Sequence, residues 1–437
     1  MRILVIAKLF PSPSTPLAGD FFANFLVRLR GQEIVPVVVS PVPYVPLIAT
    51  RLSRFSQYRS VEHHGYWEGL EVWRPCYLQA VPGGRRLWSY SRLSRLAVMP
   101  LCHALHRRHR FQLVVGYGFG PDADAAQAAA ASMGLCSVSW AIGSDVHTLP
   151  QASDENARLL RHSVRHNTMV VTESDALRRT LLDYCPWARN IHPFYKGIDL
   201  DILREPPPRA ALRSQLGLAT DRTYMVSAGS ALATKGVHEF YAAFRQLAGE
   251  RPDLAALWVG GGPEEAALRD RARQDGLAER VTVTGMVSRP LALRYMYAAD
   301  LMAFPTYAEG LSNAVMEALA AGLPIVTTDV GGDREVVAHE VTGLLIPAKD
   351  VAALVGGIRR ILNNGDWARR MGAAGRRLIL DHFDVDRNAS VGAALLRHVA
   401  SGGDPTAAIR ACANVLPGQL PMDKAREEAT SAAATPR

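Results

Sequence analysis

The sequence predicts an α/β protein of two domains, each with a parallel sheet covered by helices on both faces. Short β-branched strands alternate with amphipathic helices along most of the 437 residues, a pattern typical of parallel sheets. The alternation breaks once, around Arg204–Arg209, where three consecutive prolines can continue neither a helix nor a central strand. A chain of this length is also too long for one ordinary core.

The first domain is expected over residues 1–198. Its buried strands are predicted at Ile3–Ala7, Val35–Val39, Leu113–Val115, Ser137–Ala141 and Met169–Thr172. Helices rich in alanine or leucine are predicted at Gly19–Arg30, Asp122–Met133 and Ser174–Tyr184.

The second domain is expected over residues 223–382, after a linker at 199–222. Its strands are predicted at Tyr224–Ala228, Ala256–Gly260, Val281–Thr284, Leu301–Phe304 and Pro324–Thr327. Its helices are predicted at Val237–Ala248, Glu264–Gln274, Pro290–Ala298, Ser312–Ala321 and Val351–Asn363. A late helix within 383–406 can dock back on the first domain, and residues 407–437 lack a periodic apolar face and are expected to be disordered.

Composition points to a cytoplasmic protein. The five cysteines form no Cys-x-x-Cys pair, which argues against a disulfide framework or a zinc site. The apolar run before Lys8 is shorter than a secretory signal needs, and longer uncharged runs are broken by proline or polar residues. We therefore expect no transmembrane helix.

The net charge of +8 is unevenly distributed. Between Arg28 and Arg110 the chain has 13 basic residues and four acidic ones. A basic region of this kind binds phosphate groups or anionic surfaces, although a solvated basic surface is the simpler alternative.

The stretch from Phe304 to Asp329 carries the most chemical information. A buried strand ends at Pro305, a loop carries Glu309, and a helix opens near Ser312, which suits an N-cap. The free amides at such a helix start form an anion site suited to a diphosphate. Glu317 lies two turns along the same helix, so the two acids can hold two hydroxyl-bearing parts of one ligand.

Two further loops follow strands of the second domain. Gly229, Ser230 and Lys235 follow the first strand, and Gly260 with Gly261 follow the next. Doubly wound sheets place ligands at these strand ends. A lysine there supplies a compact positive charge to phosphate oxygens.

With these motifs the sequence resembles the retaining group 1 glycosyltransferases of the GT-B fold. The resemblance extends from the first strand to about residue 400 and is strongest over Val226–Pro347. Its motifs, in order, are Glu309-x7-Glu317, Ala320–Pro324, Asp329–Gly332, Glu335–Val337 and Thr342–Pro347.

The resemblance implies two Rossmann-like domains that face each other across a cleft, and transfer of a sugar from a nucleotide diphosphate. It implies that Glu309 and Lys235 are catalytic: Glu309 faces the transferred sugar and Lys235 binds the phosphates. It implies further donor contacts by Gly229, Ser230, Gly260, Gly261, Met286, Leu311, Ser312, Asn313 and Glu317, of which Glu317 binds the ribose. Gly19 and Asp145 would lie on loops near the acceptor and phosphates.

Four positions depart from the family pattern. Ser230 stands where an arginine is common, and Ile142 stands where a histidine often precedes the Gly-Ser-Asp turn. Lys196–Gly197 replaces the usual Asn-Gly before the hinge, and the N-terminal loop has one glycine rather than two.

Catalysis is expected to rest on charge stabilisation by Lys235 and the helix amides. No metal or other cofactor is expected, because the Asp-x-Asp patterns at Asp122, Asp199 and Asp384 have simpler explanations at helix starts and in the hinge. The nucleotide sugar is the co-substrate, and no nucleic acid partner is expected. A sugar-nucleotide epimerase and an inactive sugar-nucleotide-binding subunit remain alternatives, because a fold does not fix a reaction.

The segment Arg85–Met99 combines basic residues with an apolar stripe, a composition suited to an anionic membrane surface. A helix packed on its domain with a solvated basic face is the alternative. We expect peripheral attachment to the inner membrane leaflet and an acceptor that is lipid-linked or a growing saccharide of envelope or exopolysaccharide assembly.

Overall fold

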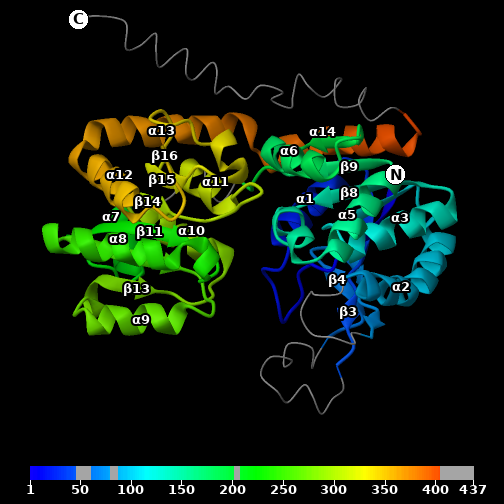
Figure 1. The fold of residues 1–437 in the computed structure, drawn as a ribbon, viewed down its shortest axis with the longest axis horizontal. Helices are drawn as coiled ribbons and strands as arrows, with labels where there is room; N and C mark the ends of the chain where they lie inside the picture. The colour runs from blue at the N-terminus through cyan, green and yellow to red at the C-terminus, as the bar shows by residue number, and fades with distance from the viewer. Residues whose placement is uncertain (46–60, 79–86, 201–206, 404–437) are drawn as a thin grey trace, which may run out of the picture. The chain divides into compact units, whose positions relative to one another are not determined.

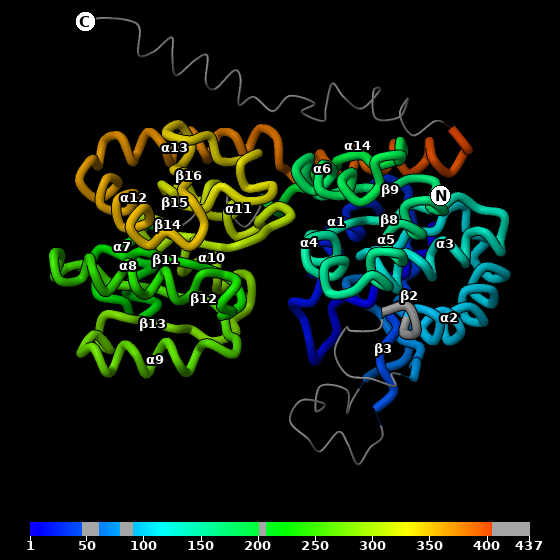
Figure 2. The backbone as a smooth tube through the Cα atoms, viewed as in Figure 1, coloured from blue at the N-terminus to red at the C-terminus, as the bar shows by residue number. Residues whose placement is uncertain are grey.

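The computed structural model describes residues 1–45, 61–78, 87–200 and 207–403. The predicted disordered tail, Arg85 and Arg86 lie outside the described residues. The chain forms two compact units (Figures 1 and 2). Unit 1 contains the chain up to Gly197 and again from Val385, and unit 2 contains Ile198–Asp384.

Unit 1 is built on an eight-stranded sheet in the order β10-β9-β8-β7-β1-β2-β5-β4. All neighbours are parallel except β4 and β5. Its strands are β1 (Arg2–Ile6), β2 (Val35–Val39), β4 (His64–Trp67), β5 (Leu70–Trp73), β7 (Leu113–Tyr117), β8 (Cys136–Ala141), β9 (Met169–Thr172) and β10 (Ile191–Pro193), with a separate parallel pair of β3 (Val42–Pro43) and β6 (Cys76–Tyr77). Its helices are α1 (Asp20–Arg30), α2 (Leu87–His109), α3 (Pro121–Met133), α4 (Ser144–His147), α5 (Asp154–His166), α6 (Asp175–Tyr184) and α14 (Val385–Ala400).

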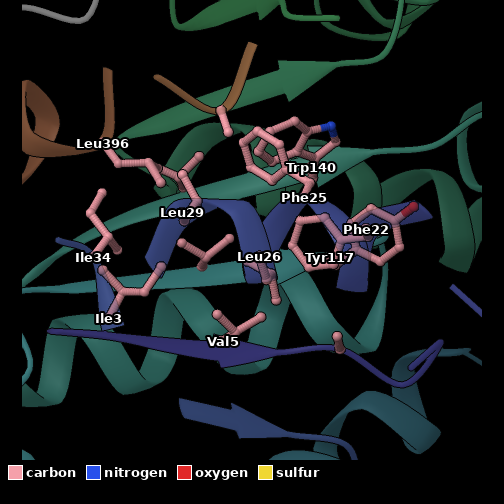
Figure 3. Close-up of a cluster of buried hydrophobic side chains, with 14 of the residues drawn as sticks. Ile3, Val5, Phe22, Phe25, Leu26, Leu29, Ile34, Tyr117, Trp140 and Leu396 are labelled. Atoms are coloured by element: carbon pink, nitrogen blue, oxygen red, sulfur yellow. The ribbon is translucent and has the colours of Figure 1, made fainter. Parts of the chain in front are cut away.

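The core of unit 1 joins the two ends of the described chain. Phe22 of α1 stacks on Tyr117 at a centroid distance of 3.8 Å, and Phe25 meets Trp140 edge to face at 5.5 Å (Figure 3). Leu396 of α14 lies in the same cluster. A Cβ on Gly392 would lie 2.7 Å from the Phe25 ring, so α14 approaches α1 as closely as glycine allows. The late helix is therefore part of unit 1.

Unit 2 has a six-stranded parallel sheet in the order β13-β12-β11-β14-β15-β16. Counted along the unit, this is the doubly wound order 3-2-1-4-5-6. Its strands are β11 (Thr223–Ala228), β12 (Leu254–Val259), β13 (Val281–Val283), β14 (Leu301–Phe304), β15 (Ile325–Thr328) and β16 (Leu344–Ile346). Its helices are α7 (Arg209–Gln215), α8 (Val237–Glu250), α9 (Glu265–Gln274), α10 (Arg289–Ala298), α11 (Asn313–Ala320), α12 (Val351–Asn363) and α13 (Gly365–His382), with short 3₁₀ turns η5 (Ala233–Lys235) and η7 (Gly331–Glu335).

The expected linker at 199–222 is not a simple connection from residue 207 onward, because this part belongs to unit 2. It contains α7, whose Arg213 is buried and donates to the Ala298 carbonyl at 2.9 Å and to Asp300 at 2.6 Å. The proline run delays the helix start but does not keep the following residues out of unit 2. None of the helices in the described ranges combines the length and apolar character needed to cross a membrane.

Candidate active site

The candidate site lies where the strand order of unit 2 reverses direction. β11 and β14 are neighbours in the sheet although two strands separate them in sequence. In doubly wound folds, ligands bind outside the carboxyl ends of the strands at such a reversal of strand order. The loop after β11 carries Lys235, and the loop after β14 carries Glu309.

Lys235 and Glu309 form an ion pair at this edge. The Lys235 Nζ atom lies 2.5 Å from Glu309 Oε1. The Thr306 hydroxyl donates to the same carboxylate oxygen at 2.9 Å. The Glu309 side chain is 11% exposed and that of Lys235 28%, so both charges reach solvent from a partly enclosed position.

Backbone contacts fix the two loops against each other. Gly236 has a positive φ of 72°, and a Cβ there would lie 2.0 Å from the Pro305 carbonyl oxygen. The Tyr307 N–H donates to the Thr234 carbonyl at 2.9 Å. A residue other than glycine at position 236 would push the loops apart and separate Lys235 from Glu309.

The glycine-rich loops after β11, β12 and β13 form one layer beside this pair. A Cβ on Gly260 would lie 2.1 Å from the Gly229 carbonyl oxygen, and the Ala231 N–H donates to the Gly261 carbonyl at 2.9 Å. Gly260 also pairs with Gly285 in a β-bridge. Ser230 is exposed, and the neighbouring Met286 is 76% exposed. The structure thus brings the predicted residues of these three loops together.

The start of α11 corrects one expectation. The Ser312 hydroxyl caps the helix by accepting from Val315 N–H at 3.3 Å. The Ser312 N–H, expected to be open to a diphosphate together with those of Leu311 and Asn313, instead donates to Asp333 Oδ1 at 2.9 Å. Because the first residues of a helix lack intrahelical acceptors, the amides of Asn313 and Ala314 remain suited to an anion.

Glu317 lies on α11 with a partner that sequence reasoning missed. Arg289, at the start of α10, places Nε 2.7 Å from Glu317 Oε1, and both side chains are largely buried. A basic residue opening the helix after the Gly285–Met286 loop was the available signal. Asp333 and Thr306 were also missed, because neither belongs to the acidic or glycine patterns that drew attention to this region.

Gly19 and Asp145 belong to unit 1, so they are described apart from the site in unit 2. Gly19 caps α1 with a φ of 68°, and a Cβ there would lie 2.2 Å from the Leu9 carbonyl oxygen. Asp145 Oδ2 accepts from Phe119 N–H at 2.7 Å, and Oδ1 accepts from Gly143 N–H at 2.8 Å. Burial raises the Asp145 pKa, and these amide bonds oppose that rise. The Asp145 carboxyl therefore braces the Gly143 turn.

Both carboxylates of the first Asp-x-Asp pattern accept hydrogen bonds from other parts of unit 1. Asp122 accepts from Lys8 N–H at 2.9 Å, and Asp124 accepts from the Ser91 hydroxyl at 2.5 Å. In the described ranges, no group of three or more His, Cys, Asp or Glu side chains is placed to hold a metal ion.

Comparisons with known proteins find a family match over unit 2 and several relatives of the chain. Residues 208–378 match the family model of glycosyl transferases group 1. The chain is 26% identical over 392 residues, 89% of its length and 96% of the relative's, to a Bacillus subtilis glycosyltransferase whose name assigns it to teichuronic acid biosynthesis. It is 32% identical over 209 residues to a GDP-mannose-dependent phosphatidylinositol monomannoside mannosyltransferase of Mycobacterium tuberculosis, covering 46% of this chain and 54% of that protein.

The fold is shared with solved structures as well. Sucrose-phosphate synthase from Thermosynechococcus elongatus superposes with a TM-score of 0.74, covering 92% of this chain and 100% of that one, at 20% identity. This likeness confirms the predicted fold class, with two Rossmann-like domains. The motifs around Glu309 and Glu317, the family match over unit 2 and the near full-length relative agree: residues 208–378 form a group 1 glycosyltransferase domain, and the chain is a glycosyltransferase.

Proposed function

We propose that this glycosyltransferase moves a sugar from a nucleotide diphosphate to a lipid-linked or growing saccharide of cell-envelope or exopolysaccharide assembly, with retention of the anomeric configuration. The observation that carries the proposal is the Lys235–Glu309 pair at the switch point of unit 2, beside the start of α11. The names of the two relatives, in teichuronic acid biosynthesis and in phosphatidylinositol mannoside synthesis, support this class of acceptor.

In this mechanism the leaving diphosphate gains negative charge while its bond to the sugar breaks. Lys235 and the amides of Asn313 and Ala314 would stabilise that charge, a contribution of preorganised donors and cations. The acceptor hydroxyl would attack from the face that the diphosphate leaves and pass its proton to the departing phosphate oxygen, so the configuration is retained. Glu309 would orient the sugar and stabilise its oxocarbenium-like centre electrostatically, as carboxylates do in glycosidases.

The test is release of nucleoside diphosphate from UDP-, GDP- and ADP-sugars, with and without saccharide and lipid-linked acceptors. Acceptor-dependent release supports transfer. A changed sugar without release would indicate an epimerase, and binding without reaction an inactive subunit. Analysis of the product's anomeric configuration decides retention. We further propose that no metal takes part, so activity should persist in EDTA. Loss in chelator that magnesium or manganese restores would contradict this part.

We also propose that unit 1 attaches to an anionic membrane surface through α2. Along this helix Ser91, Val98 and Cys102 are buried, whereas the opposite face exposes Arg92, Leu96, Pro100, Arg107 and Arg108. Leu96 is 70% exposed and follows the exposed Arg92 by about one helical turn, and α2 contains no acidic residue. Basic side chains around exposed apolar ones suit binding to anionic headgroups.

A further inference from the structure

Asp333 is a fully buried acid in the candidate donor site of unit 2. It lies in η7, which follows β15, the strand next to β14 in the sheet. Its side chain is 0% exposed, and its Oδ1 accepts the Ser312 N–H at 2.9 Å. A carboxyl from the β15 loop therefore fixes the first residue of the helix start to which we assign the diphosphate.

The backbone around Asp333 is packed directly on the Glu309 loop. Gly331 has a φ of 55°, and a Cβ there would lie 1.8 Å from the Glu309 carbonyl oxygen. Glycine is therefore required at position 331, since any larger residue would separate the two loops. This close approach holds Asp333, Glu309 and Ser312 in one rigid arrangement.

The second carboxyl oxygen of Asp333, Oδ2, differs from Oδ1 in its surroundings. Among the described residues, Oδ2 is buried and receives no donor from the protein. An ionised carboxylate in such a position is costly, because desolvation penalises its charge and no cation or N–H compensates at that oxygen. A protonated carboxyl avoids most of this cost.

Burial and the charged groups around Asp333 together raise the pKa of its carboxyl. Burial is the largest effect and raises its pKa well above the usual value, and the carboxylates of Glu309 and Glu335 raise it further. The Ser312 N–H and the Lys235 ammonium oppose the rise. Arg334, next to Asp333 in sequence, is half-exposed and pairs with Asp329 at 3.0 Å.

We propose that Asp333 is a positioning residue of the donor site that works as a neutral acid, fixing Ser312 at the start of α11 without placing a second negative charge beside Glu309. The inference rests on the proposed nucleotide-sugar donor site. With Asp333 neutral, the charges of Lys235, Glu309 and Asp333 sum to zero. If Asp333 were ionised, the sum would be −1 at the place where an anionic diphosphate must bind.

The proposal is tested first in the ligand-free protein, by infrared difference spectroscopy between the parent and Asp333→Asn. The parent should show the carbonyl band of a buried protonated carboxyl, and Asp333→Asn should remove it. Asp329→Asn is the matched control, because Asp329 lies four residues away and is half-exposed. A spectrum in which Asp333→Asn removes no such band would overturn the proposal, whether or not any nucleotide binds.

The second measurement is the affinity for UDP and GDP by calorimetry. Asp333→Asn is neutral and keeps an acceptor for Ser312 N–H. Its affinity for whichever of UDP and GDP binds more tightly should therefore lie within about threefold of the parent's near pH 7. If Asp333 carried a charge in the parent, removing that charge at close range should instead raise the affinity roughly tenfold or more. A gain of that size in Asp333→Asn would overturn the proposal.

A third variant provides a second measurement in case Asp333→Asn does not fold. Asp333→Ser has a shorter acceptor for the Ser312 N–H and no ionisable group. It should bind UDP or GDP more weakly than Asp333→Asn does, and it too should show no tenfold gain over the parent. If neither UDP nor GDP bound the parent, the nucleotide-donor proposal would fail, whereas the infrared band would still decide the protonation of Asp333.

Discussion

At the scale of single residues, the Lys235–Glu309 pair sets the charge balance of the candidate site. The two side chains neutralise each other at 2.5 Å, and the Thr306 hydroxyl donates a hydrogen bond to the carboxylate at 2.9 Å. A diphosphate that binds Lys235 would compete with Glu309 for it. Glu309 would then be free to face the positive character that develops at the sugar carbon.

We expect Glu309→Gln to lower turnover by about 10²–10³-fold, the range seen when a single electrostatic contact of a transition state is lost. Affinity for the nucleoside diphosphate should rise, because Lys235 loses the carboxylate that competes with the phosphates for its ammonium group. Steady-state transfer or donor hydrolysis, together with calorimetric binding, measures both effects. Glu279→Gln, at an exposed position, is the control. Unchanged turnover in Glu309→Gln would remove this residue from the mechanism.

Glu317→Ala should mainly weaken nucleotide-sugar binding. It should also lower the thermal midpoint, because Arg289 loses a largely buried partner at 2.7 Å, and breaking such pairs costs about 3–5 kcal/mol. The double variant Glu317→Ala/Arg289→Ala separates the effects: it should recover part of the stability but none of the nucleotide affinity. Parent-like binding in either variant would contradict the assignment.

Asp122 gives a pH prediction in unit 1. Burial, the largest effect, raises its pKa from 3.8 to about 7, opposed by the Lys8 N–H and the Lys8 charge. A raised carboxyl pKa means that the folded state favours the protonated form, so this group's contribution to stability is full below pH 3.8 and is lost as the pH rises toward 7.

Asp122→Asn should therefore gain stability relative to the parent between about pH 5 and pH 8, with an upper limit of about 3 kcal/mol, since only about two pH units separate pH 5 from the folded-state pKa of about 7. Thermal midpoints of both proteins at the two pH values measure the difference. The exposed Asp329→Asn should show no such divergence. Parallel midpoints for Asp122→Asn and the parent would contradict the raised pKa.

At the scale of elements, the sequence was most informative where the pattern was regular. The predicted helix at Val351–Asn363 coincides with α12, and the strand at Leu301–Phe304 with β14, because long apolar periodicity reflects burial directly. The β4–β5 hairpin was missed. Its turn, Glu68–Gly69, has positive φ at both residues, which suits a tight hairpin, but Glu-Gly is a weaker sequence signal than Asn-Gly.

The sequence predicted which residues lie at the candidate site, but not which residues they pair with. The positions of Lys235, Glu309 and Ser312 at strand and helix ends followed from local pattern. The pairing of Ser312 with Asp333, and of Glu317 with Arg289, depends on which loops the sheet order brings together. That order is set by packing of the whole unit, which local periodicity does not encode.

The exposed face of α2 leads to a prediction at the same scale. Attachment to anionic liposomes should weaken with salt, since each basic residue near the surface contributes roughly 1 kcal/mol. Co-sedimentation with anionic and neutral liposomes at low and high salt tests this. The variant Arg92→Ser/Arg107→Ser/Arg108→Ser should lose most of the binding.

A matched control replaces three basic residues of unit 2 that are exposed or half-exposed: Arg271→Ser/Arg273→Ser/Arg369→Ser. This variant should sediment like the parent. Equal recovery of every protein in the supernatant would leave a soluble acceptor as the better proposal.

At the scale of the whole molecule, the chain passes from unit 1 to unit 2 at Gly197 and returns at Val385. A protein ending at Asp384 would lack α14, which contributes Leu395 and Leu396 to the core of unit 1. Each buried leucine stabilises by about 1.5–3 kcal/mol, and domains have only about 5–15 kcal/mol in total. We expect this truncated protein to be insoluble or largely unfolded in unit 1, measured by soluble yield and thermal unfolding. A protein ending at Gly403 is the control, and parent-like unfolding of the shorter protein would contradict the role of α14.

The position of α14 near the end of the chain also determines when unit 1 can finish folding during synthesis. The roughly 190 residues between the two crossings take about 10–40 s to synthesise at the usual rate of elongation. Throughout that interval the α1 surface around Phe25 lacks the helix that covers it, so the nascent chain presents apolar surface to chaperones. Unit 2 is continuous in sequence between the crossings and has no such wait. The domain that is synthesised first is therefore the one completed last.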